Sequence, residues 1–328
     1  MIFLSQFETS ARKQSTAQLS AVYLYLSSSV AGRTIVSDYP SRLINGYFEF
    51  IGLESVVRAH MMQYGDSCIT VSGYYKEVNT SGEESTTSFS AVQVIFTMAS
   101  LRKAGSLTAD VFATNRFFTP SKVSWMAEKQ QMHLYYYKTT YESYSVTYTL
   151  EDGSTRTVTG SAGAGFGSVP VNPNAGEVKA EIVMGNRSHT VFYLPMEKYE
   201  LIQFRNVFNA WEYVCLPCST DEDLSSEYEL ATVDGKDSRY DIENRLELKV
   251  KTSPLPAFMY DTLVGLVHAV TVQRYDPYKS GNTVYGAWSQ VYVKDYKLPR
   301  STNPNSEIVM EMTLAFSDRA RNDAVVIS

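Results

Sequence analysis

The stretch YSVTYTLEDGSTRTVTG, residues 144–160, indicates the class of fold that the rest of the chain follows. Two runs rich in Thr, Val and Tyr lie on either side of Asp152-Gly153, and their side chains alternate as they do in β-strands. Asp-Gly is a favoured pair in tight hairpin turns whose two central residues both need positive φ. The segment therefore predicts a β-hairpin.

The same alternation recurs on both sides of this hairpin. Residues 67–75 and 88–98 predict a second hairpin, with the polar stretch 76–87 as a long loop. Residues 178–194 predict a third, which turns at Gly185-Asn186. Further strands are expected over 18–26, 243–252, 268–275, 289–298 and 307–316. The 24 Tyr and 15 Phe fit this pattern, because aromatic side chains suit pleated, half-buried surfaces.

Helical periodicity is confined to two segments. Residues 52–65 place apolar side chains, with His60 among them, on one stripe that ends at Gly65, and residues 253–267 repeat the pattern after two prolines. On such a stripe His60 is read as a packed histidine rather than as a catalytic base. The predicted fold class is mainly β, with serial β-sandwich modules and two short helices.

Loop-like segments divide the chain into three expected units. Residues 101–107 and 115–122 separate an N-terminal β-sandwich-like module (1–114) from a middle β module (115–199). The glycine-rich segment 161–176 is read as a flexible loop inserted in the middle module, and a C-terminal β domain with one short helix covers 200–328. No period of 20–50 residues repeats along the chain.

Charge and hydropathy disfavour two classes of partner. The formal net charge is −6 and no basic run occurs, so nucleic-acid binding has little electrostatic support. No apolar stretch approaches the roughly 20 residues of a membrane span. Arg12 and Lys13 precede a short apolar run that resembles a signal peptide imperfectly, and we read that run as a strand. We expect no nucleic acid, no membrane insertion and no signal peptide.

Cys215-Leu216-Pro217-Cys218 has the C-x-x-C spacing of zinc sites and of thiol–disulfide enzymes. A zinc site needs four ligands, but the one remaining thiol, Cys68, and the four histidines are scattered singly. Acidic residues follow the motif, and they would raise a thiol pKa rather than lower it. We predict two reduced thiols on a strand that Pro217 ends, and a zinc or redox role stays an alternative.

Other motif-like segments lack the context that their chemistry needs. Gly163, Gly165 and Gly167 do not form G-x-G-x-x-G, and no helix follows them to bind a phosphate. An EF-hand reading that starts at Asp221 lacks its glycine and its final glutamate, so this segment is read as a solvated acidic loop. We expect no catalytic residue, cofactor or metal, although a glycosidase carboxylate pair would leave no sequence signature.

The tyrosine cluster HLYYYKTTYESYSVTY, residues 133–148, predicts a strand with two aromatic faces. Alternation sends Tyr135 and Tyr137 to one face and Tyr136 to the other. An ordinary strand with one core face explains this pattern, and so does a face used for protein contacts or for stacking on a sugar.

FRNVFNAWEYV, residues 204–214, resembles a segment of structural tail proteins of tailed bacteriophages. In those proteins an N-x-F-[GN]-x-x-E stretch on a strand opens a C-terminal β domain. The matching residues here are Asn206, Phe208, Asn209 and Glu212, with Trp211 before the glutamate. Residues 115–137 are similar to a domain start in the same proteins, and the order of strands and helix after residue 242 is similar as well.

This resemblance implies a function without catalysis or cofactor. Proteins of the distal-tail or baseplate class are β-sandwich modules, commonly assembled in hexameric rings, that join the tail tube to other tail proteins. It implies that this chain is made in the host cytoplasm and assembled into the virion tail, with itself and neighbouring tail or baseplate proteins as partners. It marks Asn206, Phe208, Asn209, Trp211 and Glu212 as a structural or interface motif. A carbohydrate-binding β-sandwich protein is the alternative that tyrosine richness and acidic loops suggest.

Overall fold

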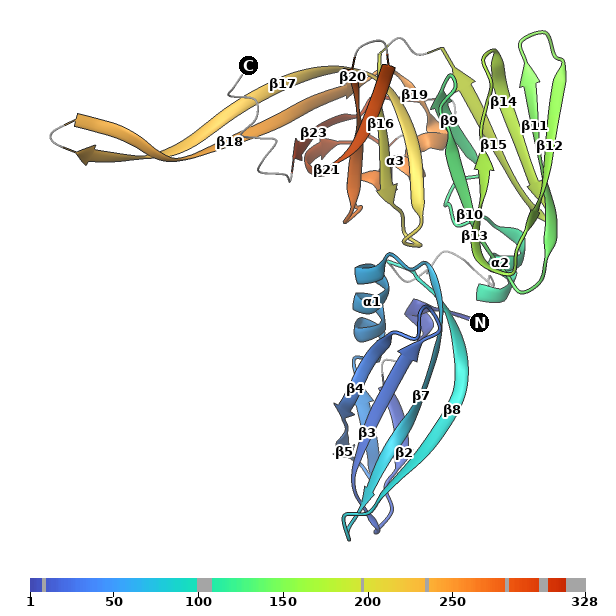
Figure 1. The fold of residues 1–328 in the computed structure, drawn as a ribbon, viewed down its shortest axis with the longest axis vertical. Coiled ribbons are helices and arrows are strands. Elements are labelled where there is room, and N and C mark those ends of the chain that lie inside the picture. The colour runs from blue at the N-terminus through green and yellow to red at the C-terminus, as the bar shows by residue number, and fades with distance from the viewer. Residues whose placement is uncertain are drawn as a thin grey trace.

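A computed structural model describes residues 1–7, 10–98, 108–195, 198–233, 236–280, 283–300 and 306–316. The described part is mainly β, so the predicted fold class is confirmed (Figure 1). Three α-helices occur there where two were expected: α1 (Leu53–Tyr64), α2 (Ala109–Asn115) and α3 (Tyr260–Val267). The predicted separator 101–107 lies outside the described residues, and α2 occupies the span just after it.

The N-terminal unit packs two sheets face to face. Phe50 of the small sheet and Leu24 and Val94 of the large one belong to a single buried cluster, and α1 adds Val57 and Met61 to it. The large sheet has the order β1-β8-β7-β3-β4 and the small one β2-β6-β5. The strands are β1 (Ile2–Phe3), β2 (Ser10–Gln14), β3 (Leu19–Ser28), β4 (Thr34–Pro40), β5 (Arg42–Ile44), β6 (Tyr47–Ile51), β7 (Cys68–Asn79) and β8 (Glu84–Ile95).

The long loop expected over residues 76–87 is wrong. Strands β7 and β8 pair through this polar stretch as far as Val78 and Glu84, and only a short turn joins them. Both strands are exposed or half-buried there, which explains why polar residues are tolerated. Asn79 closes the turn, because its Oδ1 accepts from the backbone N–H groups of Ser81 and Glu83 at 2.9 and 2.8 Å.

The middle unit has a five-stranded sheet of order β12-β11-β14-β15-β9 and a two-stranded sheet β10-β13. Its core includes Tyr136, Val146, Ile182 and Val191. The strands are β9 (Val123–Ala127), β10 (Met132–Lys138), β11 (Glu142–Leu150), β12 (Thr155–Ala162), β13 (Gly165–Val171), β14 (Glu177–Met184) and β15 (Arg187–Leu194). The hairpins predicted over 144–160 and 178–194 are confirmed.

The turn of the first of these hairpins differs from the one predicted. Of its residues only Gly153 has positive φ, at 83°, whereas the expected turn needs two such residues. Gly153 N–H donates to Leu150 O at 3.0 Å, and Leu150 N–H donates to Ser154 O at 2.9 Å. This is a three-residue loop whose last residue is left-handed, a geometry that also matches the twist of the strands.

The flexible insertion expected over 161–176 is also wrong, because β13 covers Gly165–Val171 and pairs with β10 along its whole length. Glycine is required there by packing. Gly167 lies opposite Tyr136, whose ring occupies the space that a Cβ would need. Gly160 opposite Tyr144 repeats this arrangement. In both pairs the tyrosine ring lies over the glycine on the neighbouring strand, and only glycine leaves room for it.

In the C-terminal unit the sheet closes into a barrel of order β16-β17-β18-β23-β21-β20, rather than forming an open sandwich. Helix α3 packs Leu263 and Leu266 on the barrel core, next to Phe204 and Leu248. A 3-10 turn (Ala257–Met259) and a short sheet precede it, so the helix is shorter than the predicted 253–267. The strands are β16 (Tyr199–Arg205), β17 (Trp211–Val233), β18 (Lys236–Thr252), β19 (Leu255–Pro256), β20 (Val272–Ser280), β21 (Thr283–Lys297), β22 (Glu307–Ile308) and β23 (Glu311–Phe316).

Pro217 does not end a strand, contrary to expectation, and the acidic segment after it is not a loop. Strand β17 pairs with β16 up to Pro217, pairs with β18 from Cys218, and continues to Val233. Proline is tolerated at this change of partner, where its carbonyl accepts from Ser253 N–H at 2.7 Å. Beyond the barrel, β17 and β18 form a two-stranded ribbon that projects from the molecule (Figure 1). We call this ribbon, made of residues 224–233 and 236–245, the arm.

Two glycines of the same segment should respond oppositely to substitution. Gly167→Ala should lower the free energy of unfolding by ~1–3 kcal/mol, because the new Cβ meets the Tyr136 ring. Gly163→Ala should be neutral or stabilising by ~0.4–1 kcal/mol, since nothing lies within 4 Å of its Cβ position. Urea unfolding of both variants checks this, and equal effects would contradict the packing explanation.

Candidate functional site

Of the five residues singled out by sequence, Asn206, Phe208 and Asn209 lie in the turn between β16 and β17, and Trp211 and Glu212 are the first residues of β17. Asn206 N–H donates to Ala210 O at 2.9 Å, and Asn209 N–H donates to Asn206 O at 2.8 Å, so the backbone closes on itself. Asn209 has φ of 56°, a left-handed conformation that asparagine tolerates better than most residues. We call residues 206–212 the joint, because all three units contact it.

Asn206 fixes the shape of the joint. Its side chain is buried, and its Oδ1 accepts from the N–H groups of Phe208 at 2.9 Å and Ala210 at 3.3 Å. Its Nδ2 donates to Phe118 O of the middle unit at 2.8 Å and to Glu212 Oε2 at 3.0 Å. The amide thereby makes four hydrogen bonds, two as donor and two as acceptor, which aspartate or leucine could not reproduce.

Glu212 is a buried carboxyl whose three hydrogen-bond partners are all neutral. Besides Asn206, Thr119 of the middle unit donates to Oε1 at 3.2 Å and Thr262 of α3 at 3.3 Å. Burial raises the pKa of Glu212 to about 7, and the three hydrogen bonds limit that rise. Because a threonine hydroxyl can donate or accept, this site can hold either the charged or the neutral carboxyl.

Phe208 anchors an aromatic cluster between the units. Its ring lies 4.7 Å from that of Phe112 and 5.8 Å from that of Phe118, centroid to centroid. Phe3 and Ile95 of the N-terminal unit belong to the same buried cluster. Apolar burial thus holds together elements that are far apart in sequence.

Asn209 and Arg205 bind the end of helix α1. Asn209 Nδ2 donates to Met61 O at 3.0 Å and to Asp66 O at 3.1 Å, and Arg205 donates to Gly65 O at 3.3 Å. Carbonyl groups at a helix end lack partners within the helix, so they accept readily from a neighbouring unit. The Arg205 guanidinium also lies 4.2 Å from the centre of the Trp211 ring, which places Trp211 at the edge of the joint.

The tyrosine cluster divides as alternation predicted. Tyr136 lies in the core of the middle unit, whereas Tyr135 and Tyr137 pack against the aromatic cluster around Phe208. Tyr137 also accepts a hydrogen bond from Gln93 of the N-terminal unit. The second face of this strand therefore serves contacts within the chain.

Sequence reasoning missed two residues of this region. Arg205 directly precedes the recognised motif but had no pattern of its own. Arg187 is 2% exposed and donates to the carbonyls of Ala113, Arg116 and Tyr137, which ties the end of α2 to the middle unit. A lone arginine after a hairpin turn carries no signal that it is buried, so only the structure reveals it.

The C-x-x-C pair does not form a common site. Residues three apart on a strand point to opposite faces, so Cys215 lies in the core of the middle unit and Cys218 in that of the barrel. Cys68 belongs to the cluster around Phe208, and all three thiols are free and buried. Burial raises the pKa of Cys215 to about 12. Within the described ranges, no three His, Cys, Asp or Glu side chains gather as metal ligands. His60 is buried, and burial lowers its pKa.

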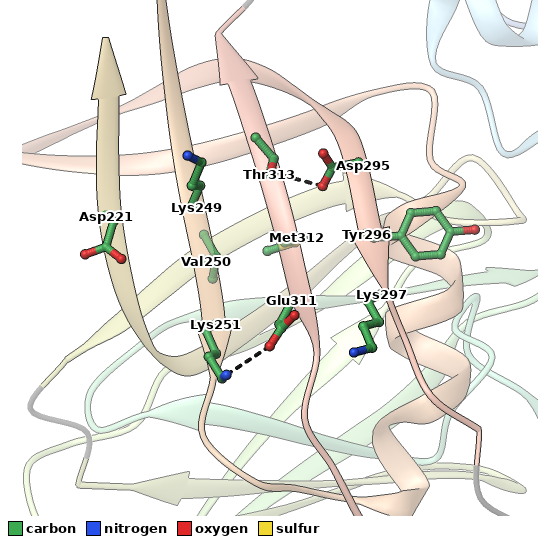
Figure 2. Close-up of a pocket in the computed structure, with 10 residues that line it drawn as sticks. All are labelled: Asp221, Lys249, Val250, Lys251, Asp295, Tyr296, Lys297, Glu311, Met312 and Thr313. Atoms are coloured by element: carbon green, nitrogen blue, oxygen red, sulfur yellow. Dashed lines mark hydrogen bonds and ion pairs between the residues drawn. The ribbon is translucent and has the colours of Figure 1, made fainter.

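The outer face of the barrel carries cross-strand charge pairs next to the arm (Figure 2). A depression of about 380 Å³ lies over β17, β18, β23 and β21. Lys251 and Glu311 form an ion pair at 2.9 Å, and Thr313 donates to Asp295 at 3.0 Å. Positive and negative side chains alternate from strand to strand, which is a pattern that sets pairing register.

A larger cleft of about 760 Å³ is lined by residues of β16, β17 and β20 and by Gln130 of the middle unit. Its lining includes Cys218 and Glu200, and the Glu200 carboxylate forms an ion pair with Arg274 at 2.6 Å. Tyr199 and Tyr275 also line it, and Gln130 donates to the Tyr199 hydroxyl at 2.9 Å. Hydroxyl, amide and aromatic groups therefore converge in one hollow.

The protonation of Glu212 should be visible in the stability of the protein. The pKa of Glu212 in the folded protein lies above the ordinary value of 4.5, so folding favours the neutral carboxyl. Its contribution to the free energy of unfolding is fully present below pH 4.5 and is lost as pH rises to about 7. The free energy of unfolding should fall by about 3 kcal/mol over this range. Glu212→Gln should fold and lack this dependence, because its amide oxygen can accept from Asn206 and its NH₂ can donate to the threonines.

The measurement is the difference in unfolding free energy between wild type and Glu212→Gln from pH 4 to pH 8. Taking the difference cancels the titration of other groups, such as Asp66, whose pKa burial also raises. Glu212→Ala is the contrasting variant, because it leaves Asn206 Nδ2 short of one acceptor. A flat difference across this range would contradict the assignment.

Comparisons with known proteins give no family. No protein-family model matches the chain, and no curated protein matches it. Among solved structures, the extracellular region of plexin A4 aligns with 95% of this chain and 38% of its own length, at 9% identity and a TM-score of 0.21. A similarity of this size carries no argument about function. No helix in the described part of the chain is long and apolar enough to cross a membrane.

Proposed function

We propose that this chain is a structural, self-assembling component of a virion tail, of the distal-tail or baseplate type. Identical copies form a ring that connects the tail tube to other tail parts. The resemblance of residues 204–214 to phage tail proteins motivates this proposal, and the observation that carries it is the arm. The role needs no catalysis and no cofactor.

The arm has the properties of an assembly element. Its two strands pair with each other from Leu224↔Leu246 outward to Val233↔Lys236. A two-stranded ribbon is marginally stable in water, and its outer edges present backbone N–H and C=O groups to any partner strand. Such an element gains stability when another chain covers it, and a ring of identical copies supplies that cover.

The joint supports the same proposal. It fixes the N-terminal unit, the middle unit and the barrel to one another through buried hydrogen bonds and the Phe208 cluster. A ring closes only when each copy presents its contact surfaces at a constant angle. In this proposal the motif at 206–212 sets that angle from within the chain and does not contact the neighbouring copy.

The arm should be needed for assembly and dispensable for folding. In the test variant, residues 226–244 are replaced by Asn-Gly, which joins the paired Ser225 and Arg245 through a tight turn. Light scattering coupled to size exclusion should show a closed oligomer for wild type and a monomer for the variant. Circular dichroism and thermal unfolding of the variant serve as the folding control.

Electron microscopy of the wild-type oligomer should show rings. A wild-type protein that stays monomeric at high concentration and never joins a phage particle would contradict the proposal. If the variant without the arm still assembles, the arm is not the assembly element.

The cleft beside Cys218 favours a second candidate function, which is carbohydrate binding. Its volume suits a small ligand, and its lining combines the rings of Tyr199 and Tyr275 with the amide of Gln130 and the hydroxyl of Thr220. Lys198 and Asp221 also line the cleft and are exposed, and their charges are opposite, so a neutral, hydroxyl-rich ligand suits it better than an ion.

An array of di- to tetrasaccharides tests this second function. A saccharide that binds on the array should also show saturable binding to the protein in isothermal titration calorimetry. Tyr275→Ala should abolish binding, whereas Tyr141→Ala, at an 81% exposed tyrosine that does not line the cleft, is the control. An array without binding would exclude this function.

A further inference from the structure

Strand β12 lies at the border of the five-stranded sheet of the middle unit. β11 pairs with one of its edges from Thr155 to Ala162 without a register shift, and no described strand pairs with the other edge. Val158 of β12 lies opposite Val146, which is 1% exposed in the core, yet Val158 itself is 40% exposed. An apolar side chain on the core face of the sheet is thus left uncovered, because no further strand lies beside it.

The hairpin turn fixes which backbone groups of β12 face this open edge. Leu150 N–H donates to Ser154 O, so the carbonyl of Ser154 faces β11. The backbone groups of successive residues in a strand alternate between its two edges. The residues whose N–H and C=O groups face the open edge are therefore Thr155, Thr157, Thr159 and Ser161.

Other open edges of the two sandwich units carry features that discourage strand pairing. In the N-terminal unit, a bulge interrupts the pairing of β8 with β7, and β4 shifts register twice against β3 and ends at Pro40. In the middle unit, β13 contains Pro170. Strand β12 has no proline and no bulge, and its one charged side chain, Arg156, is bound to Glu177 at 2.6 Å.

We propose that the open edge of β12 pairs with the arm of a second copy of this chain, which adds a strand to the sheet of the middle unit. This inference rests on the proposed ring and names the surface to which the arm binds. The pairing is made by backbone groups, so it needs no particular side chain of the arm.

The arm and β12 lie on opposite sides of the molecule (Figure 1). The arm projects from the barrel, whereas β11 and β12 form the opposite border of the molecule. Because one copy keeps these two segments apart, their pairing joins different copies. A contact between two different surfaces is heterologous, and it forms a ring when the rotation from copy to copy closes.

The two segments also match in length. β17 contributes residues 224–233 to the arm, and β12 has eight residues. The bulge within the arm places its extra residue in β18, between Glu243 and Tyr240, so β17 has the regular edge of the two. The outer edge of β17 is therefore the better match for β12. Pairing there would turn a marginal two-stranded ribbon into part of a larger sheet.

Proline at position 157 tests the open edge without breaking a hydrogen bond inside the copy. Thr157 N–H faces outward, so Thr157→Pro removes a donor that a partner strand needs, and proline is tolerated on the open side of an edge strand. The variant should fold, as judged by circular dichroism and thermal unfolding, and stay monomeric where the wild type forms rings. Thr157→Val is the matched control, because it keeps the N–H group and should assemble.

Val158→Lys is a second test variant. It changes no backbone group, and position 158 is exposed enough to accept a long side chain. A charge at this edge opposes the approach of another strand, so this variant should also stay monomeric.

Mixing two defective variants tests the pairing directly. The variant without the arm keeps an intact β12, and Thr157→Pro keeps an intact arm. Each should be a monomer alone. An equimolar mixture should form a dimer with one copy of each, because only one arm and one edge are left to pair. Light scattering coupled to size exclusion should show a doubled mass, and native mass spectrometry identifies the two copies.

The outcomes separate this inference from the proposed ring. If the wild type stays monomeric, the ring is wrong and this inference falls with it. If the variant without the arm is monomeric but Thr157→Pro and Val158→Lys form rings, the arm binds elsewhere and only this inference is wrong. A mixture of the two variants that stays monomeric also overturns it, and so does a loss of assembly in Thr157→Val.

Discussion

The hydrogen bond from Asn206 Nδ2 to Glu212 Oε2, 3.0 Å long and buried, lies where the three units of this protein meet. Asn206 shapes the turn that presents Phe208 to the aromatic cluster, and Glu212 collects the hydroxyls of Thr119 and Thr262. Buried polar groups without partners are costly, so each of these residues fixes the positions of the others. The relative placement of the units therefore depends on this polar contact together with the buried cluster around Phe208.

The joint also shows how a small motif can organise a chain of this size. The turn at 206–212 contains both an amide that satisfies four neighbours and a carboxyl that accepts from three. Asn209 and Arg205 extend the network to the end of α1. Asn206, Asn209 and Arg205 donate to backbone carbonyls of the other units, so they need no particular side chain there, whereas Glu212 needs the hydroxyls of Thr119 and Thr262.

Strands and hairpins were predictable from sequence because alternation reports directly on burial. The hairpins at 144–160 and 178–194 and the helix over 52–65 followed from local patterns alone. Segments were wrongly predicted as loops where pairing with a neighbouring strand outweighs a polar or glycine-rich composition. Polar residues of β7 and β8 stay in the ladder because they face solvent, and Gly167 stays in a strand because Tyr136 covers it. The barrel closure and the buried role of Arg187 depend on contacts between distant segments, which periodicity does not report.

The candidate site was predictable in identity but not in role. The motif residues Asn206, Phe208, Asn209 and Glu212 stood out by resemblance, and the structure places all of them at an internal contact. Cys215 and Cys218 stood out by spacing, and the pleat of the strand separates them. Spacing along a sequence indicates a shared site only when the local conformation turns both side chains the same way.

Strand β17 is one continuous element from Trp211 at the joint to Val233 in the arm. Its 23 residues span roughly 70 Å when extended. It is held by β16 along its first part and by β18 along the rest, so a pull along the strand loads many hydrogen bonds in parallel instead of opening them one by one. A force applied at the arm is therefore transmitted along this strand, through the barrel wall, to the joint where the three units meet.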